Sequence, residues 1–130
     1  MKKKGHRMKH PKDISILIVD DEVDIVDYIG ANFELDDFIV YKAYSVDQAL
    51  KILQENKIDF ILSDICMPKK TGMDLLEEIR INPAAVPKLL FMTGFSEITR
   101  EQAIEKGALD ILFKPIDVEK VIELVLENVS

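Results

Sequence analysis

The chain has 130 residues, of which 48% are hydrophobic and 32% charged, and its formal net charge is −7. These values are typical of one soluble globular domain, and no apolar stretch approaches the roughly 20 residues that cross a bilayer. The basic N-terminus lacks the apolar segment of a secretory signal, and a single cysteine excludes an internal disulfide, so we expect a cytoplasmic protein.

The charge is unevenly distributed along the chain. Residues 1–13 contain six Lys or Arg side chains and one acid, whereas the other 117 residues contain 11 basic and 23 acidic side chains. An acidic body argues against direct binding of nucleic acid by this domain. The basic head could contact an anionic surface, but it is more typical of a solvated tail. We therefore expect a disordered tail over residues 1–13 and one folded domain over 14–130.

Short, β-prone apolar runs alternate along the chain with segments of helical periodicity. The predicted strands are 14–19, 38–44, 59–63, 88–92 and 109–113, and the predicted helices are 22–35, 45–55, 73–81, 96–106 and 117–128. Ser45 begins a capping-box sequence, and Ser96 and Asp117 can cap the fourth and fifth helices. Gly107 can end the fourth helix.

Five strand–helix units imply parallel strands, right-handed connections and helices on both faces of the sheet. We expect an α/β fold of the flavodoxin-like, doubly wound type, a five-stranded (βα)5 sheet with strand order 2-1-3-4-5. The strand at 38–44 carries Lys42, which indicates an exposed edge. A closed barrel is excluded because it needs about eight such units.

Polar side chains follow four of the five predicted strands. Asp20 and Asp21 follow the first, Asp64 the third, Thr93 the fourth and Lys114 the fifth. The carboxyl ends of parallel strands share one edge, where open α/β sheets bind their ligands. Close carboxylates repel unless a cation intervenes, and all-oxygen ligands favour a hard cation such as Mg²⁺. An ammonium and a hydroxyl can hold phosphoryl oxygens while a carboxylate attacks phosphorus to give an acyl phosphate.

Each of these residues also has an ordinary structural explanation. Asp20 and Asp21 could cap a helix, and Asp64 could start a turn. Thr93 and Lys114 could close strands without a further role. Their common place at one sheet edge, with complementary charges, favours the phosphoryl-transfer interpretation.

Over residues 14–129 the chain resembles the receiver domains of two-component response regulators. The resemblance rests on Asp20-Asp21, on Asp64-Ile65-Cys66-Met67-Pro68 with Gly72, on Thr93-Gly94 and on Lys114-Pro115, each after its strand. It implies a phosphorelay switch, not an enzyme, that at most catalyses its own phosphorylation and dephosphorylation. The expected partners are a sensor histidine kinase or phosphotransfer protein, without nucleic acid or membrane contact by this domain.

The resemblance also implies a role for each site residue. Asp64 is expected to accept a phosphoryl group from a phosphohistidine. Asp21 is expected to bind Mg²⁺ directly and Asp20 through water, with Asp64 and the backbone carbonyl of Cys66 as further ligands. Phosphoryl contacts are expected from Thr93, Lys114 and the Gly94 N–H.

Two features depart from the family pattern, and one other invites a hypothesis. Many members have Tyr or Phe three residues before the lysine, but this chain has Ile111, which leaves the readout by the surface of the fourth helix, fifth strand and fifth helix in question. The last helix lacks the arginine of dimeric members but is broadly apolar, so Leu124 and Leu126 suggest a weak homodimer or effector surface. Phe95 could shield an acyl phosphate from water.

Other functions remain open from the sequence. One is a receiver-like scaffold without phosphoryl turnover. Another is a Mg²⁺-dependent aspartate phosphatase of the haloacid dehalogenase type, although that class has an Asp-x-Asp pattern where this chain has adjacent Asp20 and Asp21. A flavin carrier would need a Ser/Thr/Gly-rich phosphate loop after the first strand, which is missing. The domain could stand alone or belong to a larger regulator.

Overall fold

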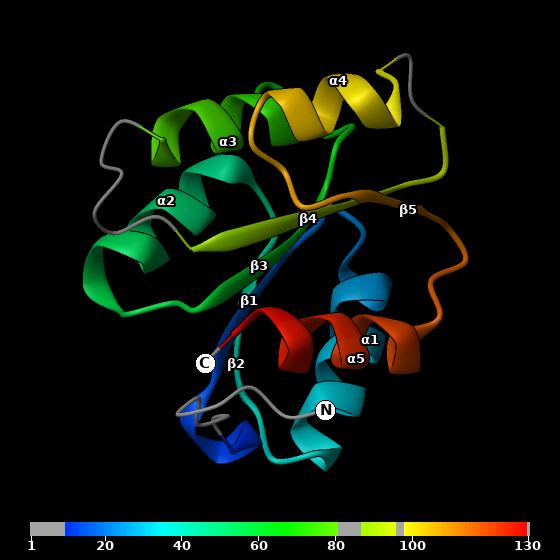
Figure 1. The fold of residues 1–130 in the computed structure, drawn as a ribbon. Helices are drawn as coiled ribbons and strands as arrows, with labels where there is room; N and C mark the ends of the chain where they lie inside the picture. The colour runs from blue at the N-terminus through cyan, green and yellow to red at the C-terminus, as the bar shows by residue number, and fades with distance from the viewer. Residues whose placement is uncertain (1–9, 81–86, 96–97, 130) are drawn as a thin grey trace.

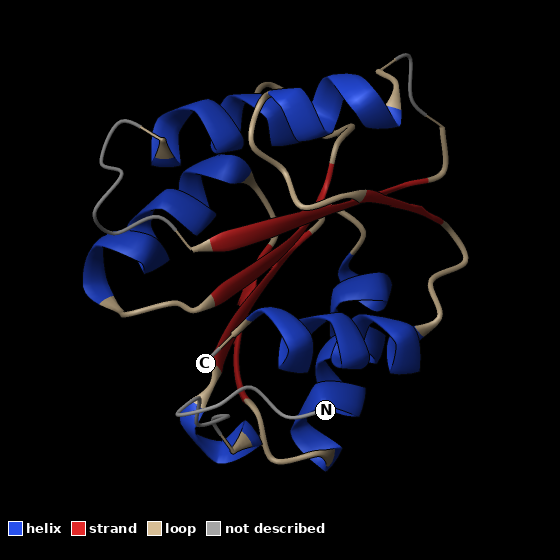
Figure 2. Ribbon diagram, viewed as in Figure 1, coloured by secondary structure: helices blue, strands red, loops and turns tan. Residues whose placement is uncertain are grey.

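The computed structural model describes residues 10–80, 87–95 and 98–129. Within them, five parallel strands form one sheet in the order β2-β1-β3-β4-β5 (Figures 1 and 2). The strands are β1 (Ser15–Val19), β2 (Ile39–Ala43), β3 (Phe60–Asp64), β4 (Lys88–Thr93) and β5 (Ile111–Phe113). The helices are α1 (Val23–Leu35), α2 (Val46–Glu55), α3 (Gly72–Ile79), α4 (Arg100–Glu105) and α5 (Val118–Asn128). The predicted fold and strand order are confirmed.

The helices cover both faces of the sheet. Helices α1 and α5 lie on one face, and α2, α3 and α4 lie on the other (Figure 1). The central strands β1 and β3 are buried almost throughout, because each contributes apolar side chains to both layers. None of the described helices combines the length and apolarity required to traverse a membrane.

Strand β2 is an edge strand, as its sequence predicts, and an ion pair from Lys42 connects it to α1. The Lys42 ammonium lies 3.4 Å from a carboxylate oxygen of Asp27 in α1. Its stem crosses the surface of Gly30, where an added Cβ would lie only 2.9 Å from the lysine Cε. Gly30 therefore leaves the space through which Lys42 reaches Asp27.

Four of the five described α-helices begin with a side-chain cap. Ser45, Thr71, Thr99 and Asp117 each accept a hydrogen bond from a backbone N–H in the first turn. At Ser45 the predicted cap is present, but the Gln48 side chain accepts from the Tyr44 N–H at 2.8 Å. The exception is α1, which begins after Glu22, because the Glu22 side chain makes no capping hydrogen bond.

The fourth helix begins later than predicted. Ser96 lies outside the described residues, and α4 starts at Arg100 with Thr99 as its N-cap. Thr99 and Gln102 form a reciprocal capping box, which satisfies two backbone donors and stabilises a helix start at Arg100. Gly107 ends the helix as predicted and has φ 113°, in the left-handed region that favours glycine.

Two further observations concern the N-terminal segment and the last helix. Pro11–Asp13, at the end of the expected tail, form a short 3-10 helix, and residues 1–9 of that tail lie outside the described part of the chain. The breadth of apolar residues in α5 is explained by packing, because Leu124 and Leu126 are half-buried against the core. Large exposed hydrophobic side chains lie instead on neighbouring elements, including Ile104 in α4 and Phe113 in β5.

Candidate functional site

Three aspartates gather where the two central strands end. Val19 and Ser63 are paired in the parallel register of β1 and β3, so the next residues, Asp20 and Asp64, emerge side by side. Asp20 is fully buried and Asp64 is 5% exposed, whereas Asp21 is exposed. Carboxylate oxygens of the three lie within 4.8 Å of one another. The strand register thus brings together the acids that the sequence placed at this edge.

A lysine that follows the edge strand β5 contacts the same acids. Lys114 follows β5, and its backbone N–H donates to the carbonyl of Thr93 at 2.9 Å, which anchors it beside β4. Its ammonium lies 2.9 Å from an Asp20 oxygen, 3.3 Å from a Glu22 oxygen and 3.5 Å from an Asp64 oxygen. Among the described residues, Lys114 is the basic side chain that pairs with these acids.

Burial and neighbouring charges shift the pKa values of Asp64 and Lys114. Burial, reinforced by the negative charge of Asp20, raises the pKa of Asp64 to about 6, although the charge of Lys114 and the backbone N–H of Cys66 act in the opposite direction. Burial alone lowers the pKa of Lys114, but the hydrogen bond to Asp20 and the charges of Asp64 and Asp20 outweigh it and raise that pKa. The ammonium is therefore charged at neutral pH.

The other predicted site residues lie in the loops after β3 and β4. Thr93 is buried, and its hydroxyl donates to the backbone carbonyl of Phe95 at 2.5 Å. The exposed Cys66 thiol lies 3.5 Å from the same carbonyl. Gly94 is exposed, and a Cβ there would meet no atom of the described residues within 4 Å. The Thr93 hydroxyl is thus engaged by its own loop and is not among the groups that contact Asp64.

Close packing by a glycine fixes the backbone at Asp64. A Cβ on Gly72 would collide with the carbonyl oxygen of Asp64 and would lie 2.8 Å from the ring of Phe91 and 3.0 Å from the Cα of Ile65. The Gly72 N–H donates to the Ile65 carbonyl at 2.8 Å. Only a residue without a side chain lets α3 begin this close to the acid.

One residue of the site was not identified from the sequence. The sequence places Glu22 only at the start of the first helix, yet its carboxylate contacts the Lys114 ammonium and its backbone N–H donates to an Asp20 carboxylate oxygen at 3.0 Å. The available signal was the run of three acids from Asp20 to Glu22 directly after a buried strand. The helix dipole also favours a run of acids at a helix start, so the run by itself does not indicate a contact with a lysine.

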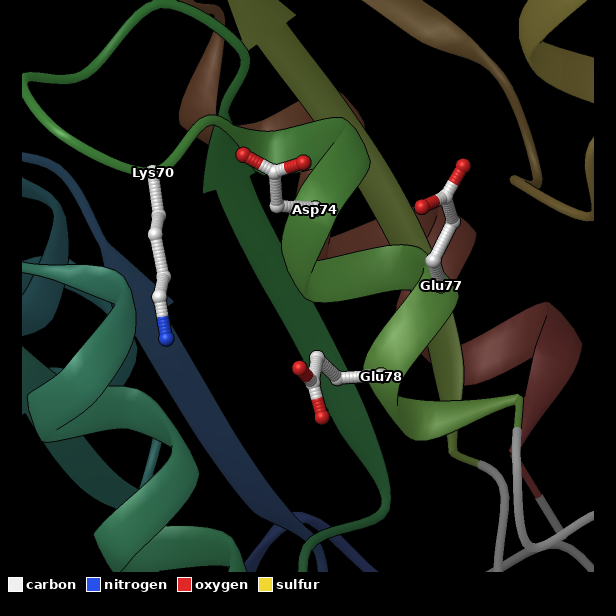
Figure 3. Close-up of a pocket in the computed structure, with 4 residues that line it drawn as sticks. All are labelled: Lys70, Asp74, Glu77 and Glu78. Carbon is white, nitrogen blue, oxygen red and sulfur yellow. The ribbon is translucent and has the colours of Figure 1, made fainter.

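The donor set fits a hard divalent cation. The cluster offers only oxygen ligands, two of its three carboxylates are buried, and their mutual repulsion is relieved only in part by Lys114. A hollow of about 400 Å³ beside α3 is lined by Lys70, Asp74, Glu77 and Glu78 (Figure 3). It contains none of the three aspartates, so it is a separate surface feature.

Comparisons with known proteins agree with this geometry. Residues 16–126 match the family model described as response regulator receiver domain. The chain is 37% identical over 111 residues to the transcriptional regulatory protein ZraR of Salmonella typhimurium, which covers 85% of this chain and 25% of that protein. The chain thus spans about a quarter of the length of this curated relative.

Solved structures give the same result. A response regulator receiver domain protein from Clostridium thermocellum is 33% identical, with a TM-score of 0.78 over 88% of this chain and 92% of that one. A CheY-like receiver domain protein from Methanospirillum hungatei is 26% identical, with a TM-score of 0.78 over 88% and 91%. The chain belongs to the response regulator receiver domain family.

Proposed function

We propose that this domain is a phosphorylation-activated switch of a two-component system and that Asp64 is its phosphoacceptor. The observation that carries the proposal is the position of Asp64: a buried carboxylate at a strand end, beside two other aspartates and 3.5 Å from the Lys114 ammonium. Receiver domains of response regulators are not enzymes in the usual sense. The proposed partner that supplies the phosphoryl group is a sensor histidine kinase or phosphotransfer protein.

The proposed chemistry is a transfer between two side chains. An Asp64 oxygen attacks phosphorus, an O–P bond forms, and the P–N bond of the donor phosphohistidine breaks, with its electron pair leaving on the imidazole nitrogen. Asp20, Asp21, Asp64 and the Cys66 carbonyl would hold Mg²⁺, which when bound neutralises the acids and the phosphoryl oxygens. The all-oxygen cluster supports this assignment.

The remaining residues would bind the transferred group. Lys114 is already within reach of Asp64, so its ammonium can pair with a phosphoryl oxygen. The Thr93 hydroxyl and the Gly94 N–H would provide two further hydrogen bonds. Because the Thr93 hydroxyl now donates to Phe95, its transfer to the phosphoryl group would release that carbonyl and alter the loop that leads to α4.

The proposed output surface comprises α4, β5 and α5. Residue 111 is a buried isoleucine and has no aromatic ring, so a readout by a rotating aromatic at this position is not available. Two exposed apolar side chains on this surface, Ile104 and Phe113, support an interaction with a downstream effector or a weak homodimer. With one cysteine in the chain, a reducing compartment such as the cytoplasm is the proposed location.

Incubation with Mg²⁺ and acetyl phosphate, followed at short intervals by intact mass spectrometry and phosphate release, tests the proposal. The expected result is one phosphoryl adduct that is absent in Asp64→Asn and in EDTA. Steady release of phosphate with no adduct at any time would favour an enzyme. Neither adduct nor release would favour a scaffold that does not exchange phosphate.

A further inference from the structure

Glu22 occupies a position where the other helices have a capping residue. Ser45, Thr71, Thr99 and Asp117 cap α2 to α5 with their side chains, whereas the Glu22 side chain leaves the first turn of α1 uncapped. Its carboxylate is instead 3.3 Å from the Lys114 ammonium. The side chain at this position therefore serves the acidic site rather than the helix.

Three carboxylates share the one ammonium. Asp20, Glu22 and Asp64 each place an oxygen within 3.5 Å of the Lys114 nitrogen, which matches the three N–H donors of a lysine. Asp20 and Asp64 belong to the cluster that could hold a cation, and Glu22 does not. Glu22 is also the most exposed of the three, with 62% of its side chain accessible.

A divalent cation in this cluster changes the balance around Lys114. It would neutralise the charge of Asp20 and Asp64 and repel the ammonium, so both of these contacts weaken together. The lysine side chain is only 17% exposed, and a partly buried ammonium needs an acceptor. Glu22 is the carboxylate already in contact that remains free to accept from it.

We propose that Glu22 is a positioning residue, which holds the Lys114 ammonium at the rim of the site when a divalent cation takes up Asp20 and Asp64. This inference rests on the proposed function, because it gives that cation and Lys114 the roles described above. Glu22 makes displacement of the lysine from Asp20 less costly, and it keeps the ammonium within reach of the place where a phosphoryl group would arrive.

The substitution Glu22→Gln tests this proposal cleanly. It keeps the size of the side chain and removes no helix cap, since this side chain makes none. Asp24→Asn is the matched control: Asp24 is an exposed acid in the first turn of the same helix, and no ion pair with Lys114 is found for it within the described residues. Both substitutions remove one negative charge from the same end of α1.

The measurement is the dissociation constant for Mg²⁺, obtained from backbone amide shifts in a titration. Both substitutions are made in the unchanged chain and in Lys114→Met. In the unchanged chain, Glu22→Gln should weaken Mg²⁺ binding about three-fold more than Asp24→Asn does, a size typical of a partly exposed ion pair. In Lys114→Met the two substitutions should have equal effects, because the lysine that Glu22 serves is gone.

Each outcome decides between the possibilities. If Glu22→Gln has the same effect in both backgrounds, or tightens Mg²⁺ binding, the positioning role is wrong while the proposed function stands. If the unchanged protein binds no Mg²⁺ at millimolar concentrations, the proposed metal chemistry is wrong and the positioning role falls with it. Thermal unfolding in EDTA verifies that all variants are folded.

Discussion

The hydroxyl of Thr93 is paired twice with the backbone of Phe95: it donates to the carbonyl at 2.5 Å and accepts from the N–H at 3.2 Å. The two bonds hold the start of the loop between β4 and α4 against the end of β4. A phosphoryl oxygen that accepts from this hydroxyl must compete with the Phe95 carbonyl. Under the proposed function, phosphorylation of Asp64 is coupled to this loop through the breaking of the hydrogen bond from Thr93 to Phe95.

Thr93→Ala should separate phosphorylation from its structural consequence. Asp64 and Lys114 are unchanged, so an adduct should still form with acetyl phosphate, but the amide shifts of α4 should respond much less to it. Loss of the two hydrogen bonds should cost about 1 kcal/mol of stability. Thr93→Ser keeps the hydroxyl and should retain most of the α4 response. An undiminished response in Thr93→Ala would contradict the coupling.

Stability should depend on pH through Asp64. Its pKa is raised from 3.8 to about 6 in the folded protein, so between these values the folded state binds more protons than the unfolded state. The free energy of unfolding of the metal-free protein should therefore fall as pH rises through this window. Asp64→Asn removes the effect, and at pH 7 it should be more stable than the parent by about 1–3 kcal/mol.

Urea unfolding in EDTA at pH 7 and pH 4 measures this difference between parent and variant. The advantage of Asp64→Asn should shrink as pH falls, and Asp24→Asn is the control for the loss of one exposed carboxylate. Added Mg²⁺ should stabilise the parent and not Asp64→Asn. A parent that is more stable than Asp64→Asn at pH 7 in EDTA would show that the Lys114 contact outweighs burial.

The two glycines of the site should differ in how strongly a change to alanine affects stability. Gly72→Ala places a Cβ against the Asp64 carbonyl and the Phe91 ring and should destabilise the fold by about 2–4 kcal/mol. Gly94→Ala places its Cβ in open space and should change stability by less than about 1 kcal/mol. Thermal unfolding compares the two, and equal losses would argue against the steric role of Gly72.

Phe95→Ala should shorten the lifetime of the acyl phosphate. Phe95 is 71% exposed, and its backbone carbonyl contacts both the Thr93 hydroxyl and the Cys66 thiol, so this residue lies next to two residues of the site. Removal of the ring should admit water and accelerate loss of the phosphoryl group several-fold. Phe113→Ala removes another exposed ring from the neighbouring strand end and serves as the control. The test is the decay of the adduct after the phosphodonor is removed, and equal decay rates in all three proteins would contradict shielding.

Strand positions could be predicted because short, β-prone apolar runs are a property of the local sequence. The apolar run before Asp64 and the run before Asp20 identify neighbouring central strands, and pairing then brings the two acids together. The error at the fourth helix arose because Ser96 and Thr99 are both capping residues. The Gln102 side chain decides for Thr99, and a search for Thr-x-x-Gln would have found it.

Contacts between distant elements were harder to predict. The ion pair between Glu22 and Lys114 connects residues that are 92 positions apart, and no local sequence pattern predicts it. The apolar breadth of α5 suggested a partner surface because sequence alone does not show how deeply Leu124 and Leu126 sit against the core. The two hydrogen bonds between the Thr93 hydroxyl and the Phe95 backbone likewise depend on a loop conformation that hydrophobic periodicity does not specify.

The lysine that crosses Gly30 to reach Asp27 also bears on how copies of this domain meet. Among the described residues, strand β2 pairs with β1 alone, and a strand from another molecule could in principle extend the sheet at its other edge. Such an extension would bring another chain against Lys42 and strip water from its ion pair with Asp27. A charged and paired lysine on the edge strand thereby discourages sheet-to-sheet growth when many copies crowd together.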